Sequence, residues 1–236
     1  MITVLVPPGT TAGRREQLDE GEQHHLRVRR AEPGELVGLR DGSGLVGTGR
    51  LVAAGREWLV DVETAHSHAR PPELTLAVGA GDRERFAWLV EKAGELGVTR
   101  ILPLETRRTG GVASRLREQH LVKLRRQALE AVKQCGAAWA AEVSAPVELA
   151  EHAGRPPSGS RWLADAAGDP PPGALDGAPV TVVVGPEGGL SDEERAALAA
   201  AGFLAVALAP HTLRFETAAL AAAAVVGTAR LRGMHG

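Results

Sequence analysis

Several residue types are scarce in this chain, and each shortage excludes a class of protein. Cys135 is the single cysteine among 236 residues, so an intrachain disulfide is impossible. Tyrosine is absent and aromatic residues make up only 3%, which leaves few platforms on which nucleic-acid bases could stack. The longest wholly apolar run, residues 218–226, is far shorter than the ~18–20 residues of a membrane-spanning helix. We therefore expect a soluble protein with no membrane partner.

Charge of one sign is also lacking. Lys and Arg total 27 against 29 Asp and Glu, a net charge of -2, so any surface for RNA must be a local cluster of basic residues. His24 and His25 have no cysteine or carboxylate at ligand spacing, so we expect no metal. The first six residues run into Pro7 without a signal-like apolar stretch, and with the lone cysteine this favours the cytoplasm.

Residues 1–70 contain short runs typical of β-strands, separated by turn residues such as Pro33-Gly34. The runs are residues 2–6, 35–39, 44–47 and 58–62. This spacing predicts a small barrel or a strongly bent sheet. Pro71-Pro72 favours a domain boundary directly after it, because proline continues neither a helix nor a central strand.

Residues 73–236 follow a different pattern, in which apolar strand-like runs alternate with long helical segments. The predicted strands are residues 74–78, 100–104, 161–164, 180–184 and 205–208, and the predicted helices are residues 83–96, 116–134, 193–201 and 216–230. Such alternation predicts an α/β domain with a mainly parallel sheet covered on both faces. Its ligand site is expected at the carboxyl ends of the strands.

The most informative segment is the turn Gly185-Pro186-Glu187-Gly188-Gly189, which follows a β-branched strand. Ser191 and Glu194 fit a capping box at the start of the next helix, and Gly202 fits its end. Glycines in a strand-to-helix turn let backbone amides approach a ligand near the positive end of the helix. The alternative is that the glycines only make a tight connection.

This turn matches neither of two common nucleotide-binding patterns. A dinucleotide fingerprint needs G-x-G-x-x-G, and a phosphate loop needs Lys-Ser/Thr after its last glycine. Glu187 would also repel a phosphate. A ligand with hydroxyls or a cationic centre is therefore favoured here.

A second segment, residues 209–218, also joins a short strand to an Ala-rich helix and contains Arg214 and Glu216. These two residues are compatible with a functional site. They are equally compatible with an ion pair at the start of a helix.

Together these motifs resemble the RsmE family, the 16S rRNA uridine-N3 methyltransferases of the SPOUT superfamily. The resemblance covers nearly the whole chain and rests most specifically on Gly185-Pro186-Glu187-Gly188-Gly189-Leu190-Ser191 and Leu213-Arg214-Phe215-Glu216-Thr217-Ala218. Supporting matches are the segment from Glu91 to Val98, Arg108, Glu130 with Gln134-Cys135-Gly136, and His24 to Arg30.

The resemblance implies an N-terminal PUA-like β-barrel for residues 1–70 and a SPOUT α/β domain with a deep trefoil knot for residues 73–236. It implies a homodimer, S-adenosylmethionine as cofactor, and a uridine of small-subunit rRNA as the target. The cofactor contacts that it implies are Leu163, Gly185, Pro186, Glu187, Gly188, Gly189, Leu208 and Leu213. The implied RNA contacts are His25, Arg27, Arg30 and Arg108.

Methylation of uridine N3 requires an aligned in-line displacement and loss of the imide proton. Glu187 and Glu216 are candidate bases, and Arg214 is a candidate stabiliser of the anionic uracil. Glu216 is equally compatible with a structural role, locking Arg214.

The chain departs from the family pattern at Ala209, His211 and Ala137, and at Gly81 or Asp82 where the family has a lysine. These departures fall in expected cofactor or RNA contacts. Two alternatives therefore stay open: the same fold acting on another RNA site, and a non-catalytic RNA-binding protein.

Overall fold

The structure is a computed structural model that describes residues 1–109 and 116–235. The chain forms two compact units. The first combines Met1–Arg70 with Leu129–Ala140, and the second contains the rest of the described chain. The sequence-based division assigned residues 129–140 to the second domain, whereas in the structure they pack with the first.

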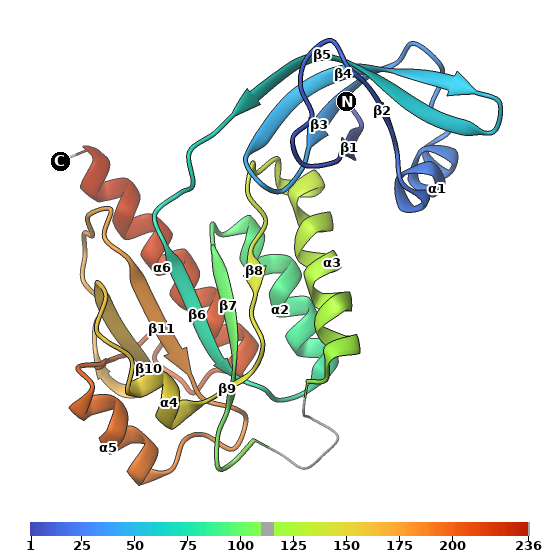
Figure 1. Cartoon of the computed structure of the whole chain (residues 1–236). Helices are drawn as coiled ribbons and strands as arrows, with labels where there is room; N and C mark the ends of the chain where they lie inside the picture. Colours follow the sequence, from blue (N-terminus) through green and yellow to red (C-terminus); the bar gives the residue numbers. More distant parts are fainter. Residues whose placement is uncertain (110–115, 236) are drawn as a thin grey trace. The chain divides into compact units, whose positions relative to one another are not determined.

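The first unit is built on a five-stranded sheet with the strand order β1-β3-β4-β5-β2 (Figure 1). Its elements are β1 (Thr3–Leu5), β2 (Arg15–Gln17), α1 (Glu20–Arg29), β3 (Leu36–Arg40), β4 (Leu45–Ala54) and β5 (Glu57–Ser67). Its neighbouring strands are antiparallel, apart from the parallel pair β1 and β3. Alternate residues of β3 to β5, with Leu26 of α1, form a core separate from that of the second unit.

A buried ion pair joins residues 129–140 to helix α1 of the first unit. Lys133 Nζ lies 2.5 Å from Glu22 Oε1 and 2.6 Å from Glu130 Oε2, and the Glu22 side chain is 1% exposed. Burial raises the pKa of Glu22, and the contact with Lys133 opposes this rise. The contact joins residues 111 positions apart, so neither segment signals it locally.

The second unit contains a parallel sheet with the order β12-β10-β11-β6-β7-β8, and β9 also pairs with β7. Its elements are β6 (Leu74–Gly79), α2 (Arg83–Glu95), β7 (Arg100–Glu105), α3 (Glu118–Cys135, which ends in the first unit), β8 (Glu142–Val143), β9 (Val147–Glu148), α4 (Leu149–Ala153), β10 (Ser160–Asp169), β11 (Val180–Val184), α5 (Asp192–Ala200), β12 (Leu204–Val206) and α6 (Phe215–His235).

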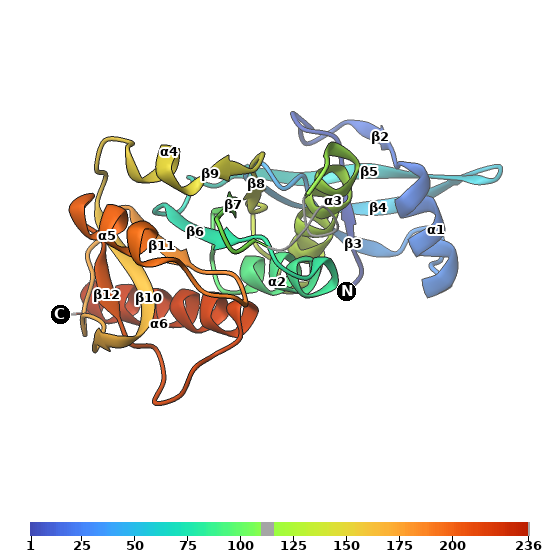
Figure 2. The same ribbon diagram turned by 90° about the horizontal axis from the view of Figure 1, so that it is seen from below.

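Helices cover both faces of this sheet, as Figure 2 shows with α4 and α5 on one side and α2 and α6 on the other. Leu74, Leu76 and Val78 of β6 point into the core beneath α2 and α6, while Ala77 points toward α4 and α5. Because both faces are buried, the strands read as continuous apolar runs. The predicted α/β architecture with a parallel sheet is confirmed. None of the described helices is long and apolar enough to cross a membrane.

The buried carboxylate of Glu194 organises the connection between β11 and α5. The Ser191 hydroxyl accepts from Glu194 N, and Ser191 N donates to Glu194 Oε2 at 2.8 Å, which confirms the predicted capping box. The other oxygen, Oε1, accepts from the backbone N–H of Arg107 at 2.8 Å. One side chain therefore joins the start of α5 to the loop after β7.

We predict that Glu194→Ala lowers the free energy of unfolding by about 2 kcal/mol, because two buried N–H groups lose their acceptor. Urea denaturation measures this change. The matched control is Glu193→Ala, since Glu193 is 69% exposed and pairs with Arg107 at 2.9 Å on the surface. Equal losses in the two variants would contradict the role assigned to Glu194.

Candidate functional site

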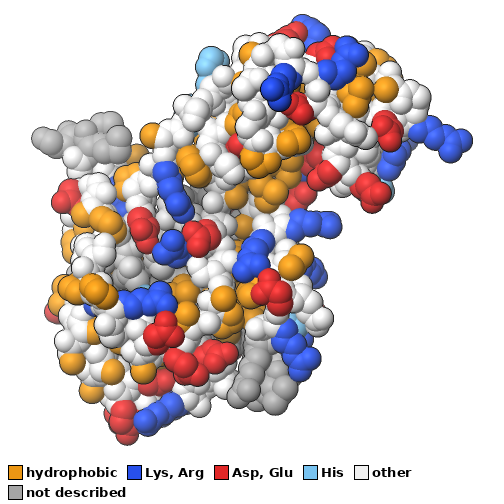
Figure 3. Space-filling model, in the orientation of Figure 1, with side chains coloured by type: hydrophobic (Ala, Val, Ile, Leu, Met, Phe, Trp, Pro, Cys, Tyr) orange, Lys and Arg blue, Asp and Glu red, His pale blue; other side chains and the backbone are white. Residues whose placement is uncertain are grey.

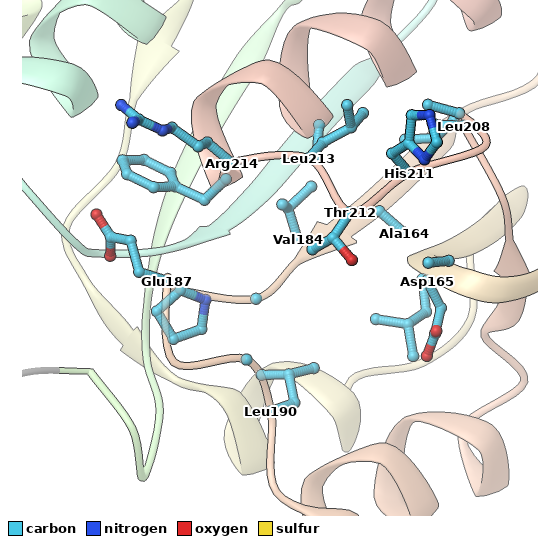
Figure 4. Close-up of a pocket in the computed structure, with 18 of the residues that line it drawn as sticks. Ala164, Asp165, Val184, Glu187, Leu190, Leu208, His211, Thr212, Leu213 and Arg214 are labelled. Atoms are coloured by element: carbon cyan, nitrogen blue, oxygen red, sulfur yellow. The ribbon is translucent and has the colours of Figure 1, made fainter.

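A cavity of about 430 Å³ lies at the carboxyl ends of β10 and β11, the edge of the sheet at which the sequence predicts a ligand site. Three segments line it: residues 163–166 of β10, the turn after β11, and the segment between β12 and α6. Figure 4 shows these segments surrounding an open central space. Its volume lies within the range of about 300–1,000 Å³ typical of small-molecule sites.

Most of the predicted cofactor contacts lie in this cavity. Those that line it are Leu163, Gly185, Pro186, Glu187, Gly189, Leu208 and Leu213. Gly188 does not line it. A Cβ at Gly188 would instead meet Arg108 Cβ at 3.3 Å, and the Gly188 carbonyl accepts a hydrogen bond from Arg108 Nη1 at 3.0 Å. The spacing of the glycines in the sequence did not indicate which glycine of the turn faces away from the cavity.

The cavity has apolar walls and charged ends. Leu163, Leu190, Leu208 and Leu213 contribute apolar surface. Arg195 neutralises Asp165 through a close ion pair. Figure 4 shows Glu187 and Arg214 on the opposite side from Asp165. The lining therefore combines an apolar slot with a carboxylate and a guanidinium at one end.

The position of Glu187 depends on two small residues at the end of β6. The backbone N–H of Asp82 donates to Glu187 Oε1 at 3.2 Å. A Cβ on Gly81 would lie 2.0 Å from Glu187 Oε2, and a Cβ on Gly79 would lie 2.5 Å from Pro186 N. Asp82 is also the N-cap of α2, since its side chain accepts from Arg85 N at 2.9 Å. Gly79 is needed because the turn backbone packs directly against the end of β6, and Gly81 leaves the space that the Glu187 carboxylate fills.

Glu216, a predicted catalytic residue, lies outside the set of residues that line the cavity. It is 7% exposed, and its Oε2 has no hydrogen-bond partner in the described chain. Arg85 of α2 lies between Glu216 and Glu187, with Nε 3.9 Å from Glu216 Oε1 and Nη1 3.9 Å from Glu187 Oε1. Sequence reasoning missed Arg85, because a single arginine at the start of a helix resembles any surface charge.

The predicted RNA contacts lie in two places. His25 and Arg27 are on α1, and Arg30 is its left-handed C-cap with a φ of 54°. Burial, with Lys133 and Arg29 nearby, lowers the pKa of His25. Arg108 lies over the glycine turn of the second unit, as described above. The structure brings the α1 residues together, and Arg108 belongs to the other unit.

The residues that depart from the family pattern are also divided between the two units. Ala209 and His211 both line the cavity, and Ala137 belongs to the first unit. Across residues 1–109 and 116–235, no three His, Cys, Asp or Glu side chains cluster in a way that could hold a metal ion.

Two family models match the chain. A model described as an RNA methyltransferase domain matches residues 68–227, and one described as an RNA methyltransferase PUA domain matches residues 18–59. The first match contains every segment that lines the cavity. The second includes α1 and β3 and extends into β5.

Individual relatives agree with these models. Ribosomal RNA small subunit methyltransferase E of Aquifex aeolicus is 31% identical over 89% of this chain and 92% of its own length. The protein of the same name from Mycobacterium tuberculosis is 31% identical over 89% and 84%. The crystal structure of a ribosomal RNA small subunit methyltransferase E from Neisseria gonorrhoeae bound to S-adenosyl methionine has a TM-score of 0.82, with 26% identity over 95% of each chain. The described chain therefore belongs to the ribosomal RNA small subunit methyltransferase E family of RNA methyltransferases.

Proposed function

We propose that this chain is an S-adenosylmethionine-dependent methyltransferase that modifies N3 of a uridine in 16S rRNA of the small ribosomal subunit. The observation that carries the proposal is the cavity at the carboxyl ends of β10 and β11, with Glu187 and Arg214 at one end. Membership of the family supports the reaction class, and the names of its relatives support the rRNA substrate.

The experiment that tests this function is methylation of small ribosomal subunits that lack the modification. Purified protein and S-adenosylmethionine should convert one uridine of the 16S rRNA to N3-methyluridine, identified by mass spectrometry of the digested RNA. Methylation of a different RNA would favour the first alternative, in which the same fold acts on another RNA site. RNA binding without any methyl transfer favours a non-catalytic protein.

The residues that line the cavity fit S-adenosylmethionine. Its leucines offer an apolar slot for an adenine ring and a methionine side chain, and Glu187 is a carboxylate suited to ribose hydroxyls or a cationic centre. Asp165 is already paired with Arg195, which leaves Glu187 as the carboxylate more available to a ligand. When bound, this cofactor supplies an electrophilic methyl group.

Gly185 supports the same fit, because there is little room beside it. A Cβ there would lie 3.2 Å from Leu190 Cγ, within the cavity wall. The larger Val side chain would push Leu190 or enter the cavity.

We predict that Gly185→Val weakens binding of S-adenosylmethionine at least ~10-fold, or about 1.4 kcal/mol, as measured by calorimetry. The control is Gly173→Val, because a Cβ at Gly173 has no atom within 4 Å. Unchanged affinity in Gly185→Val with the fold intact would show that the turn is only a connection.

Arg214 and Glu216 have different proposed roles. Arg214 is exposed in the cavity, where its guanidinium stabilises the uracil anion that forms when N3 loses its proton. Glu187 accepts that proton directly or through water. Glu216 is buried beside Arg85, so we assign it a positioning role in which it fixes the start of α6 and the segment that carries Arg214.

We predict that Arg214→Gln lowers kcat for methyl transfer ~100-fold and leaves the unfolding midpoint nearly unchanged. Glu216→Gln should instead lower the unfolding midpoint, because the buried carboxylate loses its ion pair with Arg85, which is 40% exposed. Single-turnover kinetics and urea denaturation of both variants separate the two roles. If the two variants changed kcat and the unfolding midpoint in the same way, the separate roles assigned to Arg214 and Glu216 would be contradicted.

We assign RNA contact to His25, Arg27 and Arg30 of the first unit and to Arg108 beside the cavity. On the face shown in Figure 3, basic side chains are interspersed with acidic ones, which agrees with a net charge of -2 and with contact through local clusters. Arg27 and Arg30 are exposed, and the PUA domain match includes both.

We predict that Arg27→Gln with Arg30→Gln weakens rRNA binding and reduces the slope of log K against log salt by about 2, roughly one unit per lost phosphate contact. Filter binding over a series of salt concentrations measures the slope. Arg15→Gln is the control, since the Asp61 carboxylate already neutralises Arg15 and accepts two hydrogen bonds from its guanidinium. An equal change in the control would contradict a specific role for α1.

We further propose a homodimer, a knotted C-terminal domain and a cytoplasmic location, all three as implied by the family resemblance. For the dimer there is independent support. Trp88 of α2 and Leu231 of α6 are 48% and 59% exposed, and these two helices pack against each other. A second copy of the chain packed on α2 and α6 would cover these side chains, and a monomer in sedimentation velocity would contradict the proposal.

A further inference from the structure

The two side chains with proposed roles at the reacting base belong to different segments of the chain. Glu187 is in the turn after β11, and Arg214 is in the segment between β12 and α6. The proposed reaction needs the proton acceptor beside N3 and the cation beside the carbonyl oxygens that flank N3. Because a small misplacement of either group slows such a reaction strongly, a contact that fixes the two segments relative to each other contributes to the rate.

The first turn of α2 has contacts with both segments. The N-cap of this helix, Asp82, donates its backbone N–H to Glu187 Oε1 at 3.2 Å. Phe86 is 1% exposed in the core, and α2 packs along α6. The start of α2 is therefore held by the core, and it can serve as a rigid support for the segments that contact it.

Arg85, in this same turn, uses a different nitrogen for each of two carboxylates. Its Nη1 lies 3.9 Å from Glu187 Oε1, and its Nε lies 3.9 Å from Glu216 Oε1. Glu216 is in the first turn of α6, two residues after Arg214. A planar guanidinium can address two carboxylates at once, whereas the ammonium of a lysine is a single point charge. Arg85 thus connects the turn of Glu187 to the start of α6.

The two carboxylates depend on Arg85 to different degrees. Glu216 is 7% exposed, and among the described residues Arg85 is the one cation that pairs with it. Glu187 is 40% exposed and would keep its hydrogen bond from Asp82 if Arg85 were absent. Loss of Arg85 should therefore leave a buried charge unpaired at Glu216, and should loosen the position of the carboxylate at Glu187.

We infer that Arg85 is a positioning residue for methyl transfer. Its guanidinium fixes the Glu187 carboxylate and, through Glu216, the segment that carries Arg214, so that proton acceptor and cation reach the same uracil. Arg85 is outside the set of residues that line the cavity, so its effect on the base passes through these neighbours. The inference rests on the function proposed above and adds the group that aligns its two side chains.

A double-mutant cycle on the rate of methyl transfer to unmodified small ribosomal subunits tests the link to Glu187. Arg85→Gln should slow transfer ~10-fold in the wild-type chain, because the carboxylate is displaced. In a chain that carries Glu187→Gln, the same substitution should slow transfer less than about 2-fold, because Arg85 acts through that carboxylate. Counting tritium from the labelled methyl group follows the slow variants. An equal loss in both chains, as direct contact of Arg85 with RNA would give, overturns the inference.

Urea denaturation tests the link to Glu216. Arg85→Gln should lower the unfolding midpoint, and adding Glu216→Gln should lower it no further, because the double variant no longer buries an unpaired charge. Additive losses contradict the link. If Arg85→Gln alone fails to fold, the rates of Glu216→Gln and of the double variant are compared instead. Arg85→Gln should then still slow transfer at least ~3-fold, since its contact with Glu187 is independent of position 216, and equal rates overturn the inference.

Arg155→Gln is the matched control. Arg155 pairs with Glu151 at 2.8 Å on the surface of the second unit and does not line the cofactor cavity, so this variant should keep the wild-type rate. Absence of methyl transfer by the wild-type chain contradicts the proposed function itself. Transfer by the wild-type chain that is equally fast in Arg85→Gln overturns the role of Arg85 and leaves the proposed function standing.

Discussion

The candidate site depends on one buried carboxylate, that of Glu194. It accepts backbone hydrogen bonds from Ser191 and from Arg107, so a single residue joins the β11 turn, the start of α5 and the loop after β7. Arg108, the next residue in that loop, in turn donates to the Gly188 carbonyl. Because each of these bonds has a backbone group as one partner, they fix the path of the chain around the cavity. A ligand then meets a preformed wall, and less conformational entropy is lost on binding.

The sequence predicted the parts of this arrangement that have local causes. The Ser191 and Glu194 pair has the spacing of a capping box, and Gly202 ends α5 with a φ of 84°. The strands were recognisable because burial on both faces leaves runs such as Val180–Val184 almost purely apolar. The edge of the sheet that carries the cavity followed from the parallel topology alone.

Other features were not predictable, because they depend on contacts between distant segments. Helix α1 has a weak apolar pattern, and its buried Glu22 is explained only by Lys133, far along the chain. For the same reason the sequence did not assign residues 129–140 to the first unit. The β11 turn contains three glycines, but only the fold reveals that Gly188 faces Arg108 and not the cavity. The role of Arg85 likewise depends on its contacts with Glu187 and Glu216, which belong to other segments of the chain.

The space beside Gly81 links two positions that are far apart in the sequence. Glu187 fills the volume that any side chain at position 81 would need. The two positions are therefore subject to epistasis: a lysine at position 81 is tolerated only if Glu187 adopts another rotamer or is replaced. A relative with a side chain at 81 must then direct the carboxylate at 187 elsewhere, or lack it. The residue at position 81 therefore decides where a negative charge can lie at this end of the cavity.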